Sequence, residues 1–161
     1  MIRPATPADA PAIATLWAPF FRDTTVTFNP QEKTPADIVA LISDRAALGH
    51  ASFVALDGGL AGFATYAQFR AGAGYASCME HSIILGPTAQ GRGIGRALMA
   101  ALEAHAHAAG AHQMIAGVSG ENAGGIAFHA RLGYRQIAIV PQAGHKFGRF
   151  IDLVLMQKFL S

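Results

Sequence analysis

A glycine-rich segment between a strand pattern and a helix pattern is the sharpest chemical signal in the sequence. It reads Gly86-Pro87-Thr88-Ala89-Gln90-Gly91-Arg92-Gly93-Ile94-Gly95-Arg96. Glycines at such a turn let successive backbone N–H groups point toward one anion, and the helix N-terminus adds positive potential. Arg92 and Arg96 add further positive charge. The segment therefore predicts a site for a phosphate or a pyrophosphate.

Three phosphate-binding patterns can be compared with this segment. A P-loop needs Lys-Ser/Thr where Arg92-Gly93 stands, so the hydroxyl that holds magnesium is missing. A dinucleotide fingerprint needs a final glycine where Arg96 stands. The pyrophosphate loop of coenzyme A, Gln-x-x-Gly-x-Gly, is satisfied by Gln90, Gly93 and Gly95. A glycine-rich turn without a ligand is the alternative.

Histidines and one cysteine are the other groups that metal or nucleophilic chemistry would need. His105, His107 and His112 lie close in sequence, but helix geometry does not bring residues two apart onto one face, so we predict no metal site. Cys78 is the only cysteine, which excludes an intrachain disulfide framework and a Cys-rich zinc site. A cysteine nucleophile needs a base and an orienting group, so a buried structural thiol is the favoured interpretation.

Length and charge limit the class of protein. With 161 residues, the chain predicts a single domain over residues 1–161. A net charge of +2 and the lack of a Lys/Arg run argue against a nucleic-acid partner. No apolar run approaches the roughly 18 residues of a membrane span, and the N-terminus shows no signal-peptide pattern. We expect a cytoplasmic protein without a membrane partner.

Hydrophobic spacing predicts the elements that position the glycine turn. Pro19 is expected to end or kink the first helix, residues 20–28 are expected to form a loop with aromatic anchors, and residues 141–148 are expected to form another loop. The pattern predicts an α/β or α+β fold with a mixed sheet. Strands are expected at residues 2–6, 52–56, 60–70, 75–85, 113–118, 134–140 and 150–159, and helices at residues 10–17, 35–47, 94–109 and 126–132.

Several motifs together resemble the GCN5-related N-acetyltransferases (GNAT). Residues 90–95 followed by Ala97-Leu98 are similar to motif A of that superfamily, and Glu121-Asn122 with residues 127–134 is similar to motif B. The segments Phe69-Arg70, Tyr75, Glu80-His81-Ser82 and Gly144 to Asp152 resemble the phosphinothricin acetyltransferase branch. The resemblance covers nearly the whole chain. It implies an acyl-CoA N-acyltransferase fold, with a mixed, mostly antiparallel central sheet flanked by helices.

The resemblance implies that acetyl-CoA is the cosubstrate and that no metal is needed. The pantetheine amides would pair with the backbone of Ile83, Ile84 and Leu85, and an N–H near Ile83 or Ile84 would serve as the oxyanion donor. Asn122 would bond the pantetheine arm, although an N-cap of the following helix is an equally good interpretation. The residues assigned to the pyrophosphate are Gln90, Gly91, Arg92, Gly93, Ile94, Gly95 and Arg96.

The resemblance also assigns catalytic roles. Glu80 is the candidate general base, because burial in an apolar strand should raise its pKa; the alternative is a structural carboxylate paired with Arg70. His129 is the candidate acid for the CoA thiolate, where many superfamily members have tyrosine; the alternative is an ordinary helix histidine. Tyr134 is expected to pack under the cofactor rather than donate a proton.

The acceptor is expected to be the primary amine of a small amino-acid-like molecule of the phosphinothricin or methionine sulfoximine type. Arg70 and Tyr75 would bind its carboxylate or phosphinate, and Phe28 and Lys146 would line its pocket. The branch often has a second arginine where Gly72 stands here, which leaves the acceptor open. The alternatives are a peptide N-terminus or lysine, or a non-catalytic acyl-CoA-binding module. Members of the branch pair as dimers, which implies a homodimer.

Overall fold

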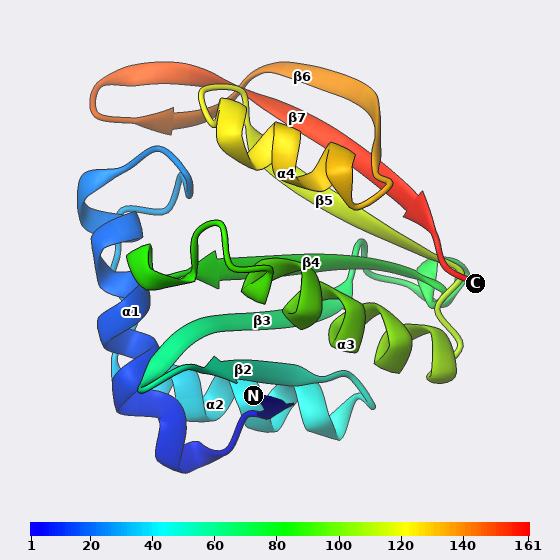
Figure 1. Ribbon diagram of the computed structural model, residues 1–161. Helices are drawn as coiled ribbons and strands as arrows, with labels where there is room; N and C mark the ends of the chain where they lie inside the picture. The colour runs from blue at the N-terminus through cyan, green and yellow to red at the C-terminus, as the bar shows by residue number, and fades with distance from the viewer.

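The computed structural model describes residues 1–161, and its strands form one seven-stranded sheet with the order β1-β2-β3-β4-β5-β7-β6 (Figure 1). Only the β4–β5 pair is parallel. This is the mixed, mostly antiparallel sheet that the resemblance implied. The strands are β1 (Ile2–Pro4), β2 (Ser52–Leu56), β3 (Leu60–Gln68), β4 (Cys78–Leu85), β5 (Gln113–Ser119), β6 (Arg135–Lys146) and β7 (Arg149–Phe159).

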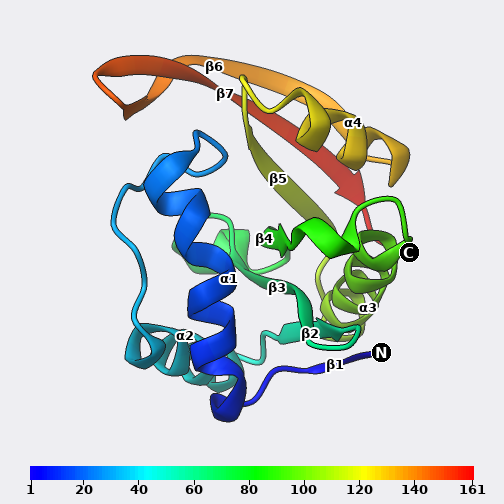
Figure 2. The same ribbon diagram turned by 60° about the vertical axis from the view of Figure 1, so that its left-hand side comes forward.

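Helices cover both faces of the sheet, as Figure 2 shows. Helices α1 and α2 pack on one face through a core that includes Ile13 and Phe63, and α3 packs on the other through a core that includes Leu98 and Met114. The four helices are α1 (Ala10–Asp23), α2 (Pro35–Ala47), α3 (Ile94–Ala108) and α4 (Ala123–Arg131), with short 3-10 turns at Pro7–Asp9, Ala73–Tyr75 and Pro87–Ala89.

The two parallel strands pair over only part of their length. The β4–β5 register runs from Cys78 opposite Gln113 to His81 opposite Ala116. Beyond that point β4 continues to Leu85 and β5 to Ser119 without pairing to each other. The strands therefore diverge in the middle of the sheet, and Figure 1 shows β5 rising away from β4.

Helix α1 does not end at Pro19, which corrects the expectation of a loop from residue 20. The helix continues to Asp23. Proline lacks the N–H that would bond one turn back, so local sequence favours a break there. The last turn carries Phe21, which is buried against Trp17 with ring centroids 5.2 Å apart. Tertiary packing thus offsets the local cost.

The segment expected to be a loop at residues 141–148 is instead part of a long β6–β7 hairpin. Strand β6 runs to Lys146, which lies opposite Arg149, and positive φ angles of 52° at Phe147 and 74° at Gly148 make the turn. The pairing shifts between Val140 and Gly144. This irregularity accommodates Pro141 within the hairpin, because an unpaired bulge residue needs no ladder N–H.

Candidate active site

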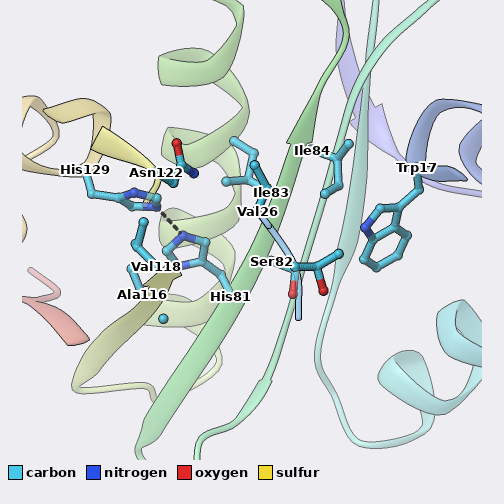
Figure 3. Close-up of a pocket in the computed structure, with 12 residues that line it drawn as sticks. Trp17, Val26, His81, Ser82, Ile83, Ile84, Ala116, Val118, Asn122 and His129 are labelled. Atoms are coloured by element: carbon cyan, nitrogen blue, oxygen red, sulfur yellow. Dashed lines mark hydrogen bonds between the residues drawn. The ribbon is translucent and has the colours of Figure 1, made fainter. Parts of the chain in front are cut away.

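A cavity of about 170 Å³ lies where β4 and β5 diverge (Figure 3). Its walls are residues 81–84 of β4 and 116–118 of β5, closed by the side chains of Val26, Asn122 and His129. Trp17 of α1 also reaches this wall. The open edges of two strands thus face one space, where the backbone is free to pair with an inserted chain.

The glycine turn follows β4 directly and presents unused backbone donors. Gly91 and Gly93 have φ angles of 71° and 74°, a left-handed conformation that favours glycine, and Gly93 is the N-cap of α3. None of the N–H groups of residues 91–96 donates a hydrogen bond within the chain. A helix N-terminus with free N–H groups is the arrangement that binds phosphate, so the turn fits a pyrophosphate group.

Gly95 has a packing reason to lack a side chain. A Cβ at this position would lie 2.7 Å from Leu85 and 2.9 Å from the ring of Phe128. Those contacts bring α3 close to the end of β4 and to α4. The glycine therefore sets how near the helix N-terminus lies to the cavity.

The two arginines of the turn differ in their surroundings. Arg92 forms an ion pair with Asp57 at the β2–β3 turn, whereas Arg96 lies 3.5 Å from the carbonyl oxygen of Arg131 and has no acidic partner. Gln90 is exposed beside them, and Ile94 packs against the core under α3. The positive charge available to an anion comes mainly from Arg96 and the helix N-terminus.

Glu80 lies on β4 just before the strands diverge, on the face opposite His81. Its Oε2 atom lies 3.5 Å from the position a Cβ of Gly117 would take, and it forms no ion pair with Arg70 or any other residue. The residue is exposed, which corrects the expectation of a buried side chain. The protein around the carboxyl still removes part of its hydration, and this raises the pKa of Glu80 above its ordinary value.

His129 is buried in the wall of the cavity rather than on the surface of α4. Its Nδ1 atom lies 2.7 Å from the carbonyl oxygen of Gly125, and its Nε2 atom lies 2.9 Å from Nε2 of His81. Burial lowers the pKa of His129 and lowers that of His81 to about 3. Both rings are therefore neutral at neutral pH.

His81 is a functional candidate that the sequence reasoning left without a role. In the sequence, His81 stands within the Glu80-His81-Ser82 segment, which resembles the phosphinothricin acetyltransferase branch. The signal was present, because alternation along a strand puts His81 on the face opposite Glu80. What the sequence did not show is that α4 brings His129 to that same face.

Asn122 acts as the N-cap of α4. Its Oδ1 atom accepts a hydrogen bond of 2.9 Å from the backbone N–H of Gly125. The residue also lines the cavity, and the capping bond leaves its side-chain NH₂ free. The capping interpretation and the pantetheine contact are therefore compatible.

Tyr134 lies behind the two histidines and does not line the cavity. Its hydroxyl donates a hydrogen bond of 2.9 Å to Glu103, and its ring packs edge-on against His81 and His129 with centroids 5.5 Å and 5.4 Å away. Burial raises the pKa of Tyr134. The phenol supports the histidine pair, and direct cofactor contact by Tyr134 stays a prediction.

The structure places Lys146 differently from the predicted position in the acceptor pocket. Its side chain is 3% exposed, and its ammonium donates to the carbonyl oxygens of Phe20, Thr24 and Thr27 at 3.2, 2.5 and 2.8 Å. Burial lowers the pKa of Lys146. The lysine thus holds the end of α1 and the segment after it, instead of facing the cavity.

Other predicted acceptor residues lie outside the cavity wall. The ring of Phe28 packs against the backbone of Gly144 in the β6–β7 hairpin. Arg70 and Tyr75 lie on the connection between β3 and β4, where the guanidinium sits 5.5 Å from the ring centroid and both residues are exposed. Their contact with a substrate stays a prediction.

The segment after α1, which includes Val26 and Thr27, forms part of the cavity wall that the sequence did not assign to the site. Thr25 Oγ1 donates a hydrogen bond of 3.0 Å to Glu121, so the segment is held from the α4 side as well as by Lys146. No local sequence pattern predicts a contact between residues this far apart.

The structure contains neither a metal-ligand cluster nor a membrane-spanning helix. The chain holds no group of three or more His, Cys, Asp or Glu side chains placed to bind one metal ion. No helix is both long and apolar enough to span a bilayer.

Comparison with known proteins places this geometry among acetyltransferases. The model of the Acetyltransferase (GNAT) family matches residues 11–134. An L-methionine sulfoximine/L-methionine sulfone acetyltransferase from Pseudomonas aeruginosa is 37% identical, over 97% of this chain and 92% of the relative.

Two solved structures share the whole fold. A GNAT superfamily phosphinothricin acetyltransferase from Sinorhizobium meliloti in complex with acetyl-CoA has a TM-score of 0.94 and 32% identity, covering 100% of this chain and 88% of that one. A ribosomal-protein-alanine N-acetyltransferase from Brucella melitensis has a TM-score of 0.94 and 34% identity, covering 99% of each chain. With the family match and the full-length relative, these likenesses show that the chain belongs to the GNAT family of acetyltransferases.

Proposed function

We propose that this enzyme transfers the acetyl group of acetyl-CoA directly to the primary amine of a small amino-acid-like molecule, of the phosphinothricin or methionine sulfoximine type. The observation that carries the proposal is one continuous path in the sheet. Unbonded N–H groups of residues 91–96 lie at one end of β4, the cavity beside β5 lies in its middle, and the carboxylate of Glu80 lies beyond.

Acetyl-CoA would supply the activated thioester, and the chain would supply its binding site. The amides of residues 91–96, Gln90 and Arg96 would hold the pyrophosphate. The pantetheine arm would lie along the unpaired edge of Ile83, Ile84 and Leu85, with Asn122 contacting it from α4. Pairing of a ligand with an open strand edge satisfies backbone groups that this divergence leaves unpaired.

Glu80 would remove the proton from the ammonium of the acceptor, directly or through a water. A raised pKa brings the carboxylate closer to the amine in proton affinity, which favours transfer. A backbone N–H near Ile83 or Ile84 would then stabilise the oxyanion of the tetrahedral adduct. No metal enters this scheme.

The acceptor would enter on the face that carries Glu80 and the segment after α1. Val26 and Trp17 give that wall an apolar surface, which suits the side chain of an amino acid. Arg70 and Tyr75, at the β3–β4 connection, would bind the carboxylate of the acceptor. The activity named for the Pseudomonas aeruginosa relative supports an acceptor of this class.

Acetylation assays with several acceptors test the proposal. We expect CoA release with methionine sulfoximine, methionine sulfone or phosphinothricin, and much slower release with peptides of the same concentration. Binding of acetyl-CoA without release of thiol from any amine would support the non-catalytic alternative instead.

A peptide N-terminus or lysine is the second candidate acceptor, and the likeness to the Brucella melitensis structure favours including it. The discriminating feature is the segment after α1, which Lys146 and Glu121 hold against the cavity. A fixed wall leaves little room for residues beyond the first. Turnover of a tetrapeptide at the rate of a free amino acid would favour this alternative.

We also infer that two copies of the chain associate through the β6–β7 hairpin. Strand β6 is an edge strand, and it exposes several large apolar side chains, which a monomer rarely leaves in contact with water. Analytical ultracentrifugation of the Ile139→Asp variant tests this, because a charge there should convert a dimer to a monomer. The exposed residues are Ile137, Ile139, Val140, Phe147 and Phe150.

The remaining expectations are part of the same proposal. Residues 1–161 would act as one N-acetyltransferase domain in a cytoplasmic compartment, where the single thiol of Cys78 stays reduced. Its partner would be a small molecule rather than a nucleic acid or a membrane.

A further inference from the structure

Two buried histidines form one unit: His129, which the resemblance implies as the acid for the CoA thiolate, and His81, to which the proposed chemistry gives no role. His81 comes from β4 and His129 from α4, and each is 6% exposed. Their Nε2 atoms lie 2.9 Å apart, and both rings line the cavity where β4 and β5 diverge, as Figure 3 shows. Each therefore lies in the wall of the space proposed for the thioester.

The positions of the protons in this unit follow from its partners. Two neutral imidazole rings carry two N–H groups and two lone pairs. The carbonyl oxygen of Gly125 can only accept, so Nδ1 of His129 carries a proton and its Nε2 is a lone pair. Nε2 of His81 must then carry the second proton, because two lone pairs would otherwise face each other at 2.9 Å. The remaining lone pair is on Nδ1 of His81, which is buried without a hydrogen-bond partner.

The unit therefore has a place for one more proton. With a proton added at Nδ1 of His81, three N–H groups would be present, directed at Gly125, at the other ring and toward β5. The backbone of Ile115 on β5 favours the protonated form of His81. Uptake of one proton would thus convert Nδ1 of His81, which has no hydrogen-bond partner, into a donor.

Burial keeps the unit neutral at rest. The loss of hydration, together with the neighbouring His129, lowers the pKa of His81 to about 3. The charged and titratable groups packed behind the rings are Glu103 on α3, Lys158 on β7 and Tyr134. The carboxylate of Glu103 accepts hydrogen bonds from the hydroxyl of Tyr134 and from the ammonium of Lys158. Glu80 lies on the other face of β4. Negative charge on a sulfur in the cavity would offset the cost of a buried cation.

We propose that the His81–His129 unit takes up one proton while the acetyl group is transferred and returns one proton to the sulfur of CoA, with His81 as the positioning residue that accommodates the extra N–H. This inference rests on the acetyl transfer proposed above. When the carbon–sulfur bond of the tetrahedral adduct breaks, its electron pair goes to sulfur and the carbonyl forms again. The adduct nitrogen loses one proton to the unit, and the sulfur gains one from it. The products are the amide and the CoA thiol, and the unit is neutral again.

Titration of the CoA thiol bound to the enzyme tests the proposal without turnover. The ultraviolet absorbance of the thiolate reports its ionisation. In the wild-type complex we expect the thiol to ionise about one pH unit or more below the value in His81→Gln, because the unit keeps the proton next to the sulfur. Glutamine can still donate to Nε2 of His129 but cannot take up a proton. His107→Gln, at an exposed position on α3, is the matched control and should titrate as wild type.

The pH profile of kcat supplies a second readout. His81→Gln should lower kcat by about 10- to 100-fold and change the pH dependence, while the Kd of acetyl-CoA stays within about threefold. If the bound thiol and the kcat profile of His81→Gln both match the wild type, the proposal is wrong. A merely structural role would lower stability and leave the titration of the thiol unchanged.

A measurement on the wild type decides the matter if the variants fold poorly. The ¹⁵N shifts of His81 in the CoA complex should show both ring nitrogens protonated over the pH range in which the thiol ionises. Neutral shifts throughout that range would overturn the proposal. Failure of the proposed function looks different, since the wild type would then release no CoA with any amine in the assays above.

Discussion

The two ends of the proposed site, one for the cofactor and one for the acceptor, are built in different ways. The cofactor end consists of backbone amides from one continuous segment, residues 86–96, that follows β4 directly. The acceptor end is assembled from α1, the segment after it and the β6–β7 hairpin, and Lys146 joins parts that lie 119 to 126 residues apart in sequence. The local sequence of one segment determines the geometry of the cofactor end, whereas the geometry of the acceptor end depends on tertiary contacts.

This difference explains what each end can tolerate. Backbone amides bind an anion whatever the side chains are, provided that the glycine conformations hold. Side chains at the acceptor end change the shape of the wall without changing the cofactor site. The comparison therefore predicts that variants at the cofactor end change the affinity for acetyl-CoA, and that variants at the acceptor end change the affinity for the acceptor.

The largest expected effect belongs to Glu80→Gln, which lies between the two ends. Loss of the general base should lower kcat by about 10²- to 10⁴-fold, while the Kd of acetyl-CoA changes little. Isothermal titration for binding and thiol release for turnover measure the two quantities. Glu32→Gln, which changes an exposed carboxylate that does not line the cavity, is the control. Wild-type turnover in Glu80→Gln would remove Glu80 from the role of base.

The same carboxylate predicts the direction of a pH effect. A base must be deprotonated to act, and partial loss of hydration raises the pKa of Glu80. The acidic limb of the kcat/KM profile should therefore fall at a higher pH than an ordinary glutamate would give, and Glu80→Gln should lack that limb. An unchanged limb in the variant would assign it to another group.

A smaller effect is expected from Gly95→Val at the cofactor end. The new side chain would press on Leu85 and Phe128 and push the helix N-terminus away from β4. Overpacking of this kind costs about 1–3 kcal/mol, which corresponds to roughly 5- to 150-fold in acetyl-CoA affinity if the strain falls on the binding site. Gly59→Val, where a Cβ meets no atom within 4 Å, is the control. Weaker acceptor binding with normal acetyl-CoA binding would contradict the comparison.

Lys146→Met should act at the acceptor end, where it should weaken acceptor binding and leave acetyl-CoA binding unchanged. The variant leaves three carbonyl oxygens without their shared donor, so the segment that carries Val26 and Thr27 should become less ordered. We expect the KM of the acceptor to rise by about three- to tenfold, because hydrogen bonds to a charged donor contribute about 1.5–3 kcal/mol and part of that loss falls on overall stability. Acetyl-CoA affinity should stay unchanged, and a parallel loss of both affinities would show that the two ends are coupled.

The difference between local and tertiary determination also explains how much of the site the sequence could predict. The turn at Gly91 and Gly93 was identified from residue types and spacing, since positive φ angles and a helix N-terminus are local properties. The opposite is true of Lys146, which local sequence could not show to lie among the carbonyl oxygens at the end of α1. The His81–His129 contact also depends on the packing of α4 against β5, which brings His129 to His81 of β4, and no periodicity in these elements specifies it.

Prolines misled the prediction in two places for a similar reason. Pro19 and Pro141 carry strong local signals for a break, yet one lies inside α1 and the other inside β6. At Pro19 the burial of Phe21 offsets the cost of the lost hydrogen bond, and at Pro141 an irregularity in the ladder leaves no backbone N–H required. Local rules describe the cost of a conformation, and the fold decides whether that cost is offset.

The smallest effect is expected from Asp57→Ala, which leaves the backbone of the glycine turn unchanged and frees one of its arginines. Asp57 forms an ion pair with Arg92, and both side chains are partly exposed. An exposed pair of this kind contributes at most about 1 kcal/mol, so acetyl-CoA should bind about twofold more tightly and with a steeper dependence on salt. Asp44→Ala, on the surface of α2, is the control for net charge. If Asp57→Ala instead weakened binding severalfold, the ion pair would be holding the turn in shape, and side chains would matter at the cofactor end as they do at the acceptor end.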